Sequence, residues 1–467
     1  MRGVFLQDGS VAARSSIKLK NMAKRPGHVG PKCSTSKSCE PGLVSVGALS
    51  PNIPHVLGDP SMSNLDEVGR YYLDYYNGRI CKLFIVYDSD QNPFRSLISL
   101  ALEDSILLKA VLALAACHKA NTSCSFYQPD TLSVQSRKAK QDALYFKCRA
   151  ITEISCALHD VTLQRQDATV ASIFLLVFLD LLESGSDRWN FHLEGAKRLM
   201  SLFRISSQPE DGAGQDPGRT VQRIRDFIAR QLYLIETLGS TFVRPKLIPQ
   251  YSSSVYAISS QETVEQSFLG CPEYLLNAIQ SLSLKRDAAA SGVLLDQAII
   301  SNHIQDTRRI LESIQNFDCY TWASSLPQTH HSPDRDIGRL CILSESYKIG
   351  ALLYGERVIE AFASCTTVQD GLACELIRLI AILKDDRTLL KCALWPICIA
   401  GLECRRQDQR NFLTGCLERF WEDTSCLNVI NAAKILQKYW QQADGLGGDP
   451  WQWIFAIGCL GADWLLI

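Results

Sequence analysis

The residues that could do chemistry in this chain of 467 residues are its thiols, its imidazoles and one pair of carboxylates. A zinc site built from thiolates needs several cysteines close together, usually as C-x-x-C pairs that place two sulfurs on one metal. The 18 cysteines include no such pair, and Cys33 and Cys39, with five residues between them, stand alone near the N-terminus. Since two thiolates cannot close a tetrahedral site, we expect no autonomous zinc binding there and no cofactor.

Asp385-Asp386 is similar to the start of an aspartate-rich magnesium motif, such as helical terpenoid synthases use. A third acid is missing, because Arg387 and then Thr388 follow. Paired acids are also typical of a helix N-terminus, where they complement the helix dipole. We favour this second interpretation.

The histidines point to structure rather than to catalysis. His118 ends an apolar helical stretch, and His192 lies on a helix with Trp189, so we interpret both as packing or dipole partners. His330-His331 lies in a polar loop and is interpreted as solvated. The sequence has no H-E-x-x-H, G-x-S-x-G, G-x-G-x-x-G or Walker motif. We therefore predict that the protein is not an enzyme, with a terpenoid-type synthase or a metabolite-binding scaffold as the alternatives.

Residues 1–60 differ from the rest in being rich in Ser, Gly, Pro and Lys, without acids between Asp8 and Glu40. Such a segment cannot bury enough apolar surface to offset its chain entropy, so we expect it to be disordered. It is interpreted as a nuclear-import or phosphate-contacting arm, a solvated tail or a mitochondrial presequence. The basic residues concerned are Arg14, Lys18, Lys20, Lys24, Arg25, Lys32 and Lys37.

Apolar residues recur at helical spacing from about Asn64 onward, which predicts an all-α fold. We assign residues 61–467 to one large multi-helix domain, with loops at 206–219 and 324–336 and no membrane span. Ser105 is the predicted N-cap of an early helix. Other helices are predicted at 138–158, 167–182, 223–238, 272–284, 294–316, 336–363, 368–383, 387–404, 409–420 and 427–442. Six cysteines within these stretches are interpreted as reduced and buried: Cys117, Cys148, Cys341, Cys374, Cys392 and Cys398.

Five segments in a fixed order resemble the fungal-specific transcription factor domain that follows the zinc cluster in many fungal regulators. They cover about residues 65–467. They are the tyrosine-rich Tyr71–Tyr76 with Asn92-Pro93-Phe94-Arg95 and LLKAVLALAACHKAN, the segment WNFHLEGA at 189–196, FIARQLYLIETLGSTF, WPICIAGLE at 395–403, and the closing pair KYWQQ and DPWQW.

The residues of these motifs are interpreted as packing residues. Trp189 and Trp395 are predicted to fill large core volumes, Gly195 and Gly401 to let helices approach closely, and Pro396 to start or kink a helix. Asn92, Pro93, Arg95 and His192 complete the motif residues that we expect to be structural.

The resemblance implies a nuclear transcriptional regulator that acts through other regulators or co-regulators, with a homodimer and a metabolite effector as further options. The family's cysteine cluster is not found in the segment RSSIKLKNMAKRPGHVGPKCSTSKSC, although Lys-Arg-Pro is present. A decayed cluster, a mispredicted first exon and a paralogue without a cluster are the alternatives. We therefore expect DNA to be bound only weakly or through a partner.

Overall fold

The computed structural model describes residues 65–131, 133–186, 188–206, 219–244, 267–290, 296–326, 336–365, 367, 369–446, 452–459 and 462–467. The basic segment at 14–37, the pair Cys33 and Cys39, and His330-His331 lie outside these residues. The same is true of most of the two predicted loops.

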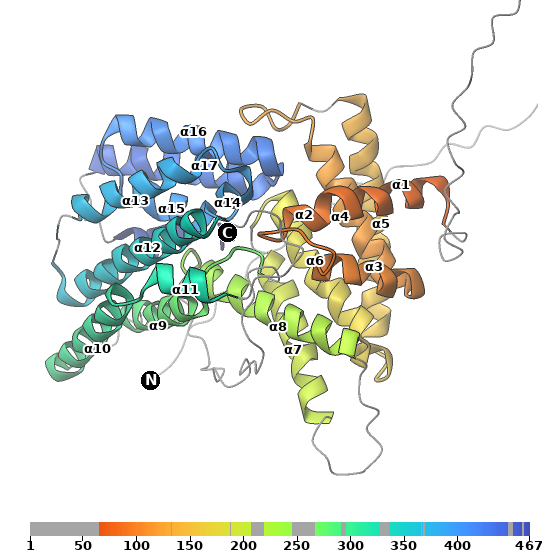
Figure 1. Cartoon of the computed structure of the whole chain (residues 1–467), viewed down its shortest axis with the longest axis horizontal. Helices are drawn as coiled ribbons and strands as arrows, with labels where there is room; N and C mark the ends of the chain where they lie inside the picture. The colour runs from red at the N-terminus through yellow and green to blue at the C-terminus, as the bar shows by residue number, and fades with distance from the viewer. Residues whose placement is uncertain are drawn as a thin grey trace, which may run out of the picture. The chain divides into compact units, whose positions relative to one another are not determined.

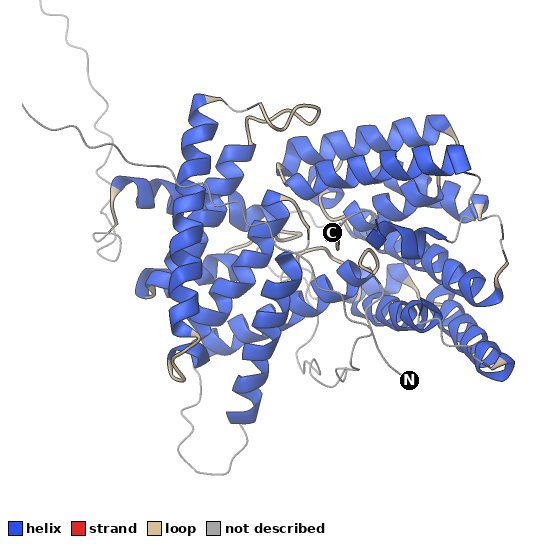
Figure 2. Cartoon of the chain, turned by 180° about the vertical axis from the view of Figure 1, so that it is seen from behind, coloured by secondary structure: helices blue, strands red, loops and turns tan. Residues whose placement is uncertain are grey.

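Helices account for the architecture, as Figures 1 and 2 show. The first helices are α1 (Glu67–Tyr75), α2 (Cys81–Leu83), α3 (Pro93–Glu103), α4 (Ser105–Asn121), α5 (Val134–Ala157), α6 (Asp167–Glu183), α7 (Arg188–Ser206) and α8 (Arg219–Ser240). They are followed by α9 (Glu273–Ala290), α10 (Gln297–Gln315), α11 (Cys319–Ser325), α12 (Ile337–Ala363), α13 (Asp370–Leu383), α14 (Arg387–Leu390), α15 (Leu394–Glu403), α16 (Gln407–Thr424), α17 (Leu427–Leu446) and α18 (Trp453–Cys459). Within the described residues the only extended pairing is an isolated bridge between Ser186 and Trp464, so the all-α prediction is confirmed.

The helices pack around one contiguous cluster of buried apolar side chains. Helix α4 packs between α5 and α6, and α6 in turn packs on α7. Nearly every residue of α6 is buried, which agrees with its apolar composition on all sides. Among the later helices, α12 contacts α9, α10, α13 and α15, while contacts between α8 and α9 and between α6 and α17 join the two groups.

Two local predictions were wrong. The N-cap of α4 is Asp104 rather than Ser105, because Asp104 Oδ1 accepts hydrogen bonds from the amides of Ile106 and Leu107, both at 2.9 Å. The predicted helix 387–404 is split into α14 and α15. Pro396 lacks an amide hydrogen, and its ring clashes with the carbonyl four residues earlier, so a continuous helix cannot form. The carbonyl at that position, on Cys392, instead accepts the Tyr347 hydroxyl at 2.7 Å.

Candidate functional site

The Asn-Pro-Phe-Arg motif starts α3 and fastens the preceding loop to it. Asn92 is the N-cap, with its Oδ1 accepting from the Phe94 amide at 2.9 Å, and Pro93 occupies the first helical position, where its missing amide hydrogen costs nothing. Asn92 Nδ2 donates to Asp88 Oδ1 at 2.9 Å, and Arg95 Nη2 lies 2.6 Å from Asp88 Oδ2. The motif thus caps α3 and ties it to the loop that precedes it.

His118 joins the first helix to the end of α16. Its Nε2 lies 3.1 Å from the Thr424 carbonyl oxygen and its Nδ1 lies 2.8 Å from the Tyr75 hydroxyl. A carbonyl can only accept, so Nε2 carries the hydrogen and Nδ1 accepts the hydroxyl. Burial, with a smaller contribution from the charge of Arg79, lowers the pKa of His118 to about 4. The imidazole is thus a neutral, fully bonded core group.

Trp189 is buried, and its ring packs against Gly239 of the facing helix α8. Its indole Nε1 donates to the Asp463 carbonyl at 3.1 Å. A Cβ built at Gly239 of α8 would lie 2.7 Å from the Trp189 ring, so only glycine fits beneath it. His192, one turn further along α7, bonds through Nδ1 to Asp180 Oδ2 at 2.7 Å. Both motif residues therefore fix α7 to its neighbours.

Trp395 repeats this arrangement in the second group of helices. It is fully buried, and its Nε1 donates to Thr241 Oγ1 at 3.2 Å. Its ring stacks on Tyr347 at 5.8 Å between centroids, and a Cβ at Gly350 of α12 would lie 2.6 Å from it. Pro396 is the third residue of α15 and so lies within its first turn.

The two motif glycines differ from each other. A Cβ at Gly401 would lie 2.6 Å and 2.8 Å from the two methyls of Leu436, and the Gly401 carbonyl accepts Trp440 Nε1 at 2.7 Å, so α15 and α17 approach closely there. A Cβ at Gly195 would meet only Ile173, at an ordinary 3.6 Å. The close approach predicted at Gly195 is therefore wrong.

A buried ionic cluster was missed by the sequence reasoning. Arg357 of α12 binds Glu403 through Nε and Nη2, at 2.9 Å and 2.5 Å, and binds Glu360 through Nη1 at 2.6 Å. Trp453 Nε1 donates to Glu403 Oε1 at 2.7 Å. The one available signal was Glu403 itself, a carboxylate that ends the otherwise apolar stretch of α15. The cluster joins α12, α15 and α18 and leaves no group free for acid–base work.

The paired aspartates form a helix start. Asp386 is the N-cap of α14, accepting from the Thr388 and Leu389 amides, and its other oxygen pairs with Arg339 at 3.0 Å. Asp385 is exposed. No group of three or more His, Cys, Asp or Glu side chains suited to a metal occurs in the part of the chain that the structure describes.

The described cysteines include buried, half-buried and exposed thiols. Those between Cys81 and Cys426 are free thiols. The buried ones include Cys392, whose pKa burial raises to about 12, so its thiol stays protonated and unreactive. The prediction of burial is wrong for Cys148 and Cys374, which are exposed on their helices, and Cys341 is only half-buried. The exposed set is Cys148, Cys156, Cys365 and Cys374.

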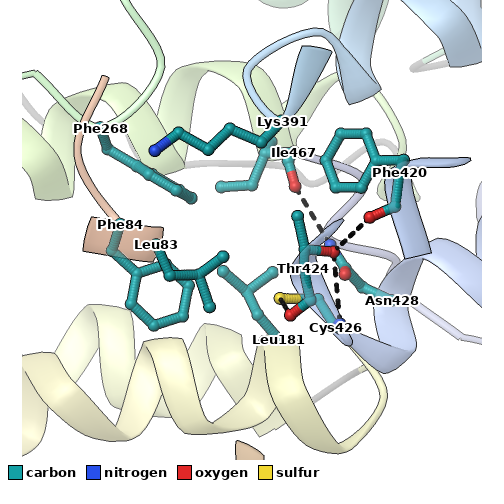
Figure 3. Close-up of a pocket in the computed structure, with 10 residues that line it drawn as sticks. All are labelled: Leu83, Phe84, Leu181, Phe268, Lys391, Phe420, Thr424, Cys426, Asn428 and Ile467. Atoms are coloured by element: carbon teal, nitrogen blue, oxygen red, sulfur yellow. Dashed lines mark hydrogen bonds between the residues drawn. The ribbon is translucent and has the colours of Figure 1, made fainter. Parts of the chain in front are cut away.

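One small pocket lies where early and late segments meet (Figure 3). Its free space is roughly that of one water molecule, too little for a metabolite. Asn428 Oδ1 is buried there without a hydrogen-bond partner among the described residues. Burial lowers the pKa of Lys391, and its Nζ donates to the Lys82 carbonyl at 2.6 Å. The lining residues are Leu83, Phe84, Leu181, Phe268, Lys391, Phe420, Thr424, Cys426, Asn428 and Ile467.

Comparison with known proteins agrees with these motifs. A family model described as the fungal specific transcription factor domain matches residues 71–467. The chain belongs to this family. A curated relative, the acriflavine sensitivity control protein acr-2 of Neurospora crassa, is 25% identical over 421 residues, which cover 85% of this chain and 67% of the relative. No solved structure matches.

Membership of the fungal specific transcription factor domain family identifies the protein as a transcriptional regulator and not as an enzyme. This agrees with the interpretation of Asp385-Asp386 as a helix start. Among the described residues, the helices are all too short or too polar to span a bilayer. Among the motif residues, Asn92, Trp189 and Trp395 are occupied by capping, packing and buried hydrogen bonds.

Proposed function

We propose that this fungal transcriptional regulator acts in the nucleus through contacts with other regulators or co-regulators. The observation that carries the proposal is that the family match extends over 71–467 while Asn92, Trp189 and Trp395 of its motifs are buried. Side chains that are buried in the core cannot contact a partner protein. The regulatory contacts of this domain then belong to its surface, and self-association into a homodimer is one form that they can take.

DNA contact is the weaker part of this function. A sequence-reading zinc module of this family needs a cysteine cluster, and the printed sequence has no C-x-x-C pair. The basic residues between Arg14 and Lys37 supply a segment that neutralises phosphates without reading bases. We propose that the basic segment serves nuclear import or weak phosphate contact, and that a partner contributes sequence-specific DNA binding.

A tethering experiment tests the regulatory role. The full chain is fused to an unrelated DNA-binding module, and transcription of a reporter that carries the cognate sites is compared with that of the module alone. A change in transcription in either direction supports the proposal. Unchanged transcription, with the fusion present at normal level in the nucleus, would contradict it.

Localisation tests the basic segment. A fluorescent fusion of the full chain is expected to concentrate in the nucleus, and a variant with Lys18, Lys20, Lys24 and Arg25 changed to alanine is expected to lose this concentration. The matched control changes the same lysines to arginine and keeps the charge. Nuclear concentration that survives the alanine changes would show that import does not use this segment.

A further inference from the structure

Helix α5 carries large apolar side chains on its solvent side. Leu144, Tyr145 and Ile151 are 51%, 62% and 41% exposed, and the exposed Cys148 lies between them. Positions 144, 148, 151, 155 and 158 follow the alternating four- and three-residue spacing of a helix–helix seam. The inner stripe of the helix, which includes Ala143 and Ala150, is buried against α4. The outer stripe has no such cover among the described residues.

The charges on this side of α5 have one sign. Four basic residues are exposed between Val134 and Cys156, and no acidic residue is. Asp142 accepts the Tyr72 hydroxyl at 2.8 Å. Glu153 pairs with Lys109 of α4 at 2.7 Å and also lies 3.8 Å from Arg149 of α5 itself. We call this surface the α5 face. It consists of Val134, Arg137, Lys138, Lys140, Leu144, Tyr145, Cys148, Arg149 and Ile151.

From this geometry we infer that the α5 face binds an amphipathic partner helix with an apolar stripe and acidic flanks. The inference rests on the proposed regulatory function and names the surface and the chemistry of its partner. A helix is the fitting occupant because the seam spacing matches helix packing, and α5, with 24 residues, offers about 36 Å of length. Acidic flanks are required because they would meet Arg137, Lys138 and Arg149.

Charge also argues against two other occupants. A second copy of the chain, docked α5 to α5, would bring two basic faces together, which costs binding free energy. The chain's own residues 14–37 are basic as well and would be repelled.

Three half-exposed apolar side chains and the stems of the basic residues offer an area at the low end of specific interfaces, below roughly 600 Å² on each partner. A transient, exchangeable contact fits this size.

Peptide binding tests the inference. The probe is a fluorescent 20-residue helical peptide with leucines at seam spacing and glutamates on both flanks, and its counterpart carries lysines in place of the glutamates. In fluorescence anisotropy the full chain is expected to bind the acidic probe at least tenfold more tightly than the basic one. The double variants Leu144→Ser/Tyr145→Ser and Lys138→Glu/Arg149→Glu are each expected to weaken binding of the acidic probe at least tenfold.

Matched controls lie on other helices. Tyr320 of α11 is 63% exposed, almost the same as Tyr145, so Tyr320→Ser removes an equivalent ring elsewhere. Lys434 and Lys438 are exposed on α17, so Lys434→Glu/Lys438→Glu makes the same charge change. Both controls are expected to keep full affinity. All these side chains are exposed, so unchanged circular dichroism and thermal midpoints should accompany every variant.

Three results would overturn the inference. One is equal binding of the acidic and basic probes, and another is an acidic-probe affinity that the α5 variants leave unchanged. The third is self-association, measured by sedimentation, that Leu144→Ser/Tyr145→Ser abolishes, since the occupant would then be a second copy. The tethered reporter separates this failure from failure of the regulatory function, because a chain that changes transcription but ignores the probe refutes only the α5 face.

Discussion

Replacing Gly401 with alanine should destabilise the protein, although alanine is the better helix former. In an open helix the change from glycine to alanine is worth about 1 kcal/mol in favour of alanine. At Gly401 the added carbon would lie within 3.3 Å of three side-chain carbons of Leu436, a residue that is itself buried. Overpacking of this kind costs typically about 1–3 kcal/mol.

The helix cannot easily move aside, because the Gly401 carbonyl is held by the Trp440 indole at 2.7 Å. We therefore expect a cost near the upper end of that range and a net loss of about 2 kcal/mol after the propensity gain. Gly195→Ala is the matched control. It also lies inside a helix and in a family motif, but the new methyl would make only ordinary contact with Ile173, so we expect a gain of about 0.5–1 kcal/mol.

Thermal unfolding followed by circular dichroism measures both variants against the unchanged chain. The expected result is a midpoint that falls for Gly401→Ala and rises for Gly195→Ala. The opposite sign of the two shifts is more informative than either magnitude. A rise for both would show that Leu436 yields to the methyl and that Gly401 is not required for packing. A fall for both would show that α7 is more tightly packed around Gly195 than the 3.6 Å contact indicates.

Three further outcomes are expected. Arg357→Ala leaves two buried carboxylates without their cation and should lower the free energy of unfolding, measured in urea, by about 3–5 kcal/mol. Arg406→Ala removes one partner of an exposed ion pair and should leave the urea midpoint unchanged. His118 has a pKa of about 4 in the folded chain against an ordinary 6.5, so the unfolded chain takes up the proton first as the pH falls. The free energy of unfolding should therefore decrease between pH 6.5 and pH 4, by up to roughly 3 kcal/mol. His118→Asn should flatten this pH dependence, and an unchanged dependence would assign it to other groups. Iodoacetamide should label the four exposed cysteines named above within minutes and leave Cys398 unlabelled until the chain unfolds, as peptide mass spectrometry would show.

Helical periodicity was sufficient to predict most of the fold. The stripe Ala143, Ala150 and Ile154 in the predicted helix 138–158 is the buried side of α5, and the apolar run at 167–182 is the central helix α6. The break before α15 was also within reach, because Pro396 is tolerated in the first turn of a helix and disfavoured in its interior. The cap of α4 was not, since Asp104 and Ser105 are adjacent residues that both favour the N-cap position.

Contacts between distant residues could not be predicted from one sequence. Arg357 and Glu403 lie 46 residues apart, and the apolar stretch that ends in Glu403 does not indicate which residue pairs with it. The same limit applies to glycines. Gly195 and Gly401 look alike in their motifs, and only the facing side chain decides which of them is required for packing.

The burial of the motif residues changes how variants of this regulator have to be interpreted. A substitution at Trp189 or Trp395 removes a buried ring together with its hydrogen bond, so lost regulation would follow from lost folding and would say nothing about partners. Substitutions at exposed positions such as Tyr145 leave the core intact. A regulatory defect in such a variant, at unchanged thermal midpoint and protein level, is therefore the kind of result that identifies a contact surface.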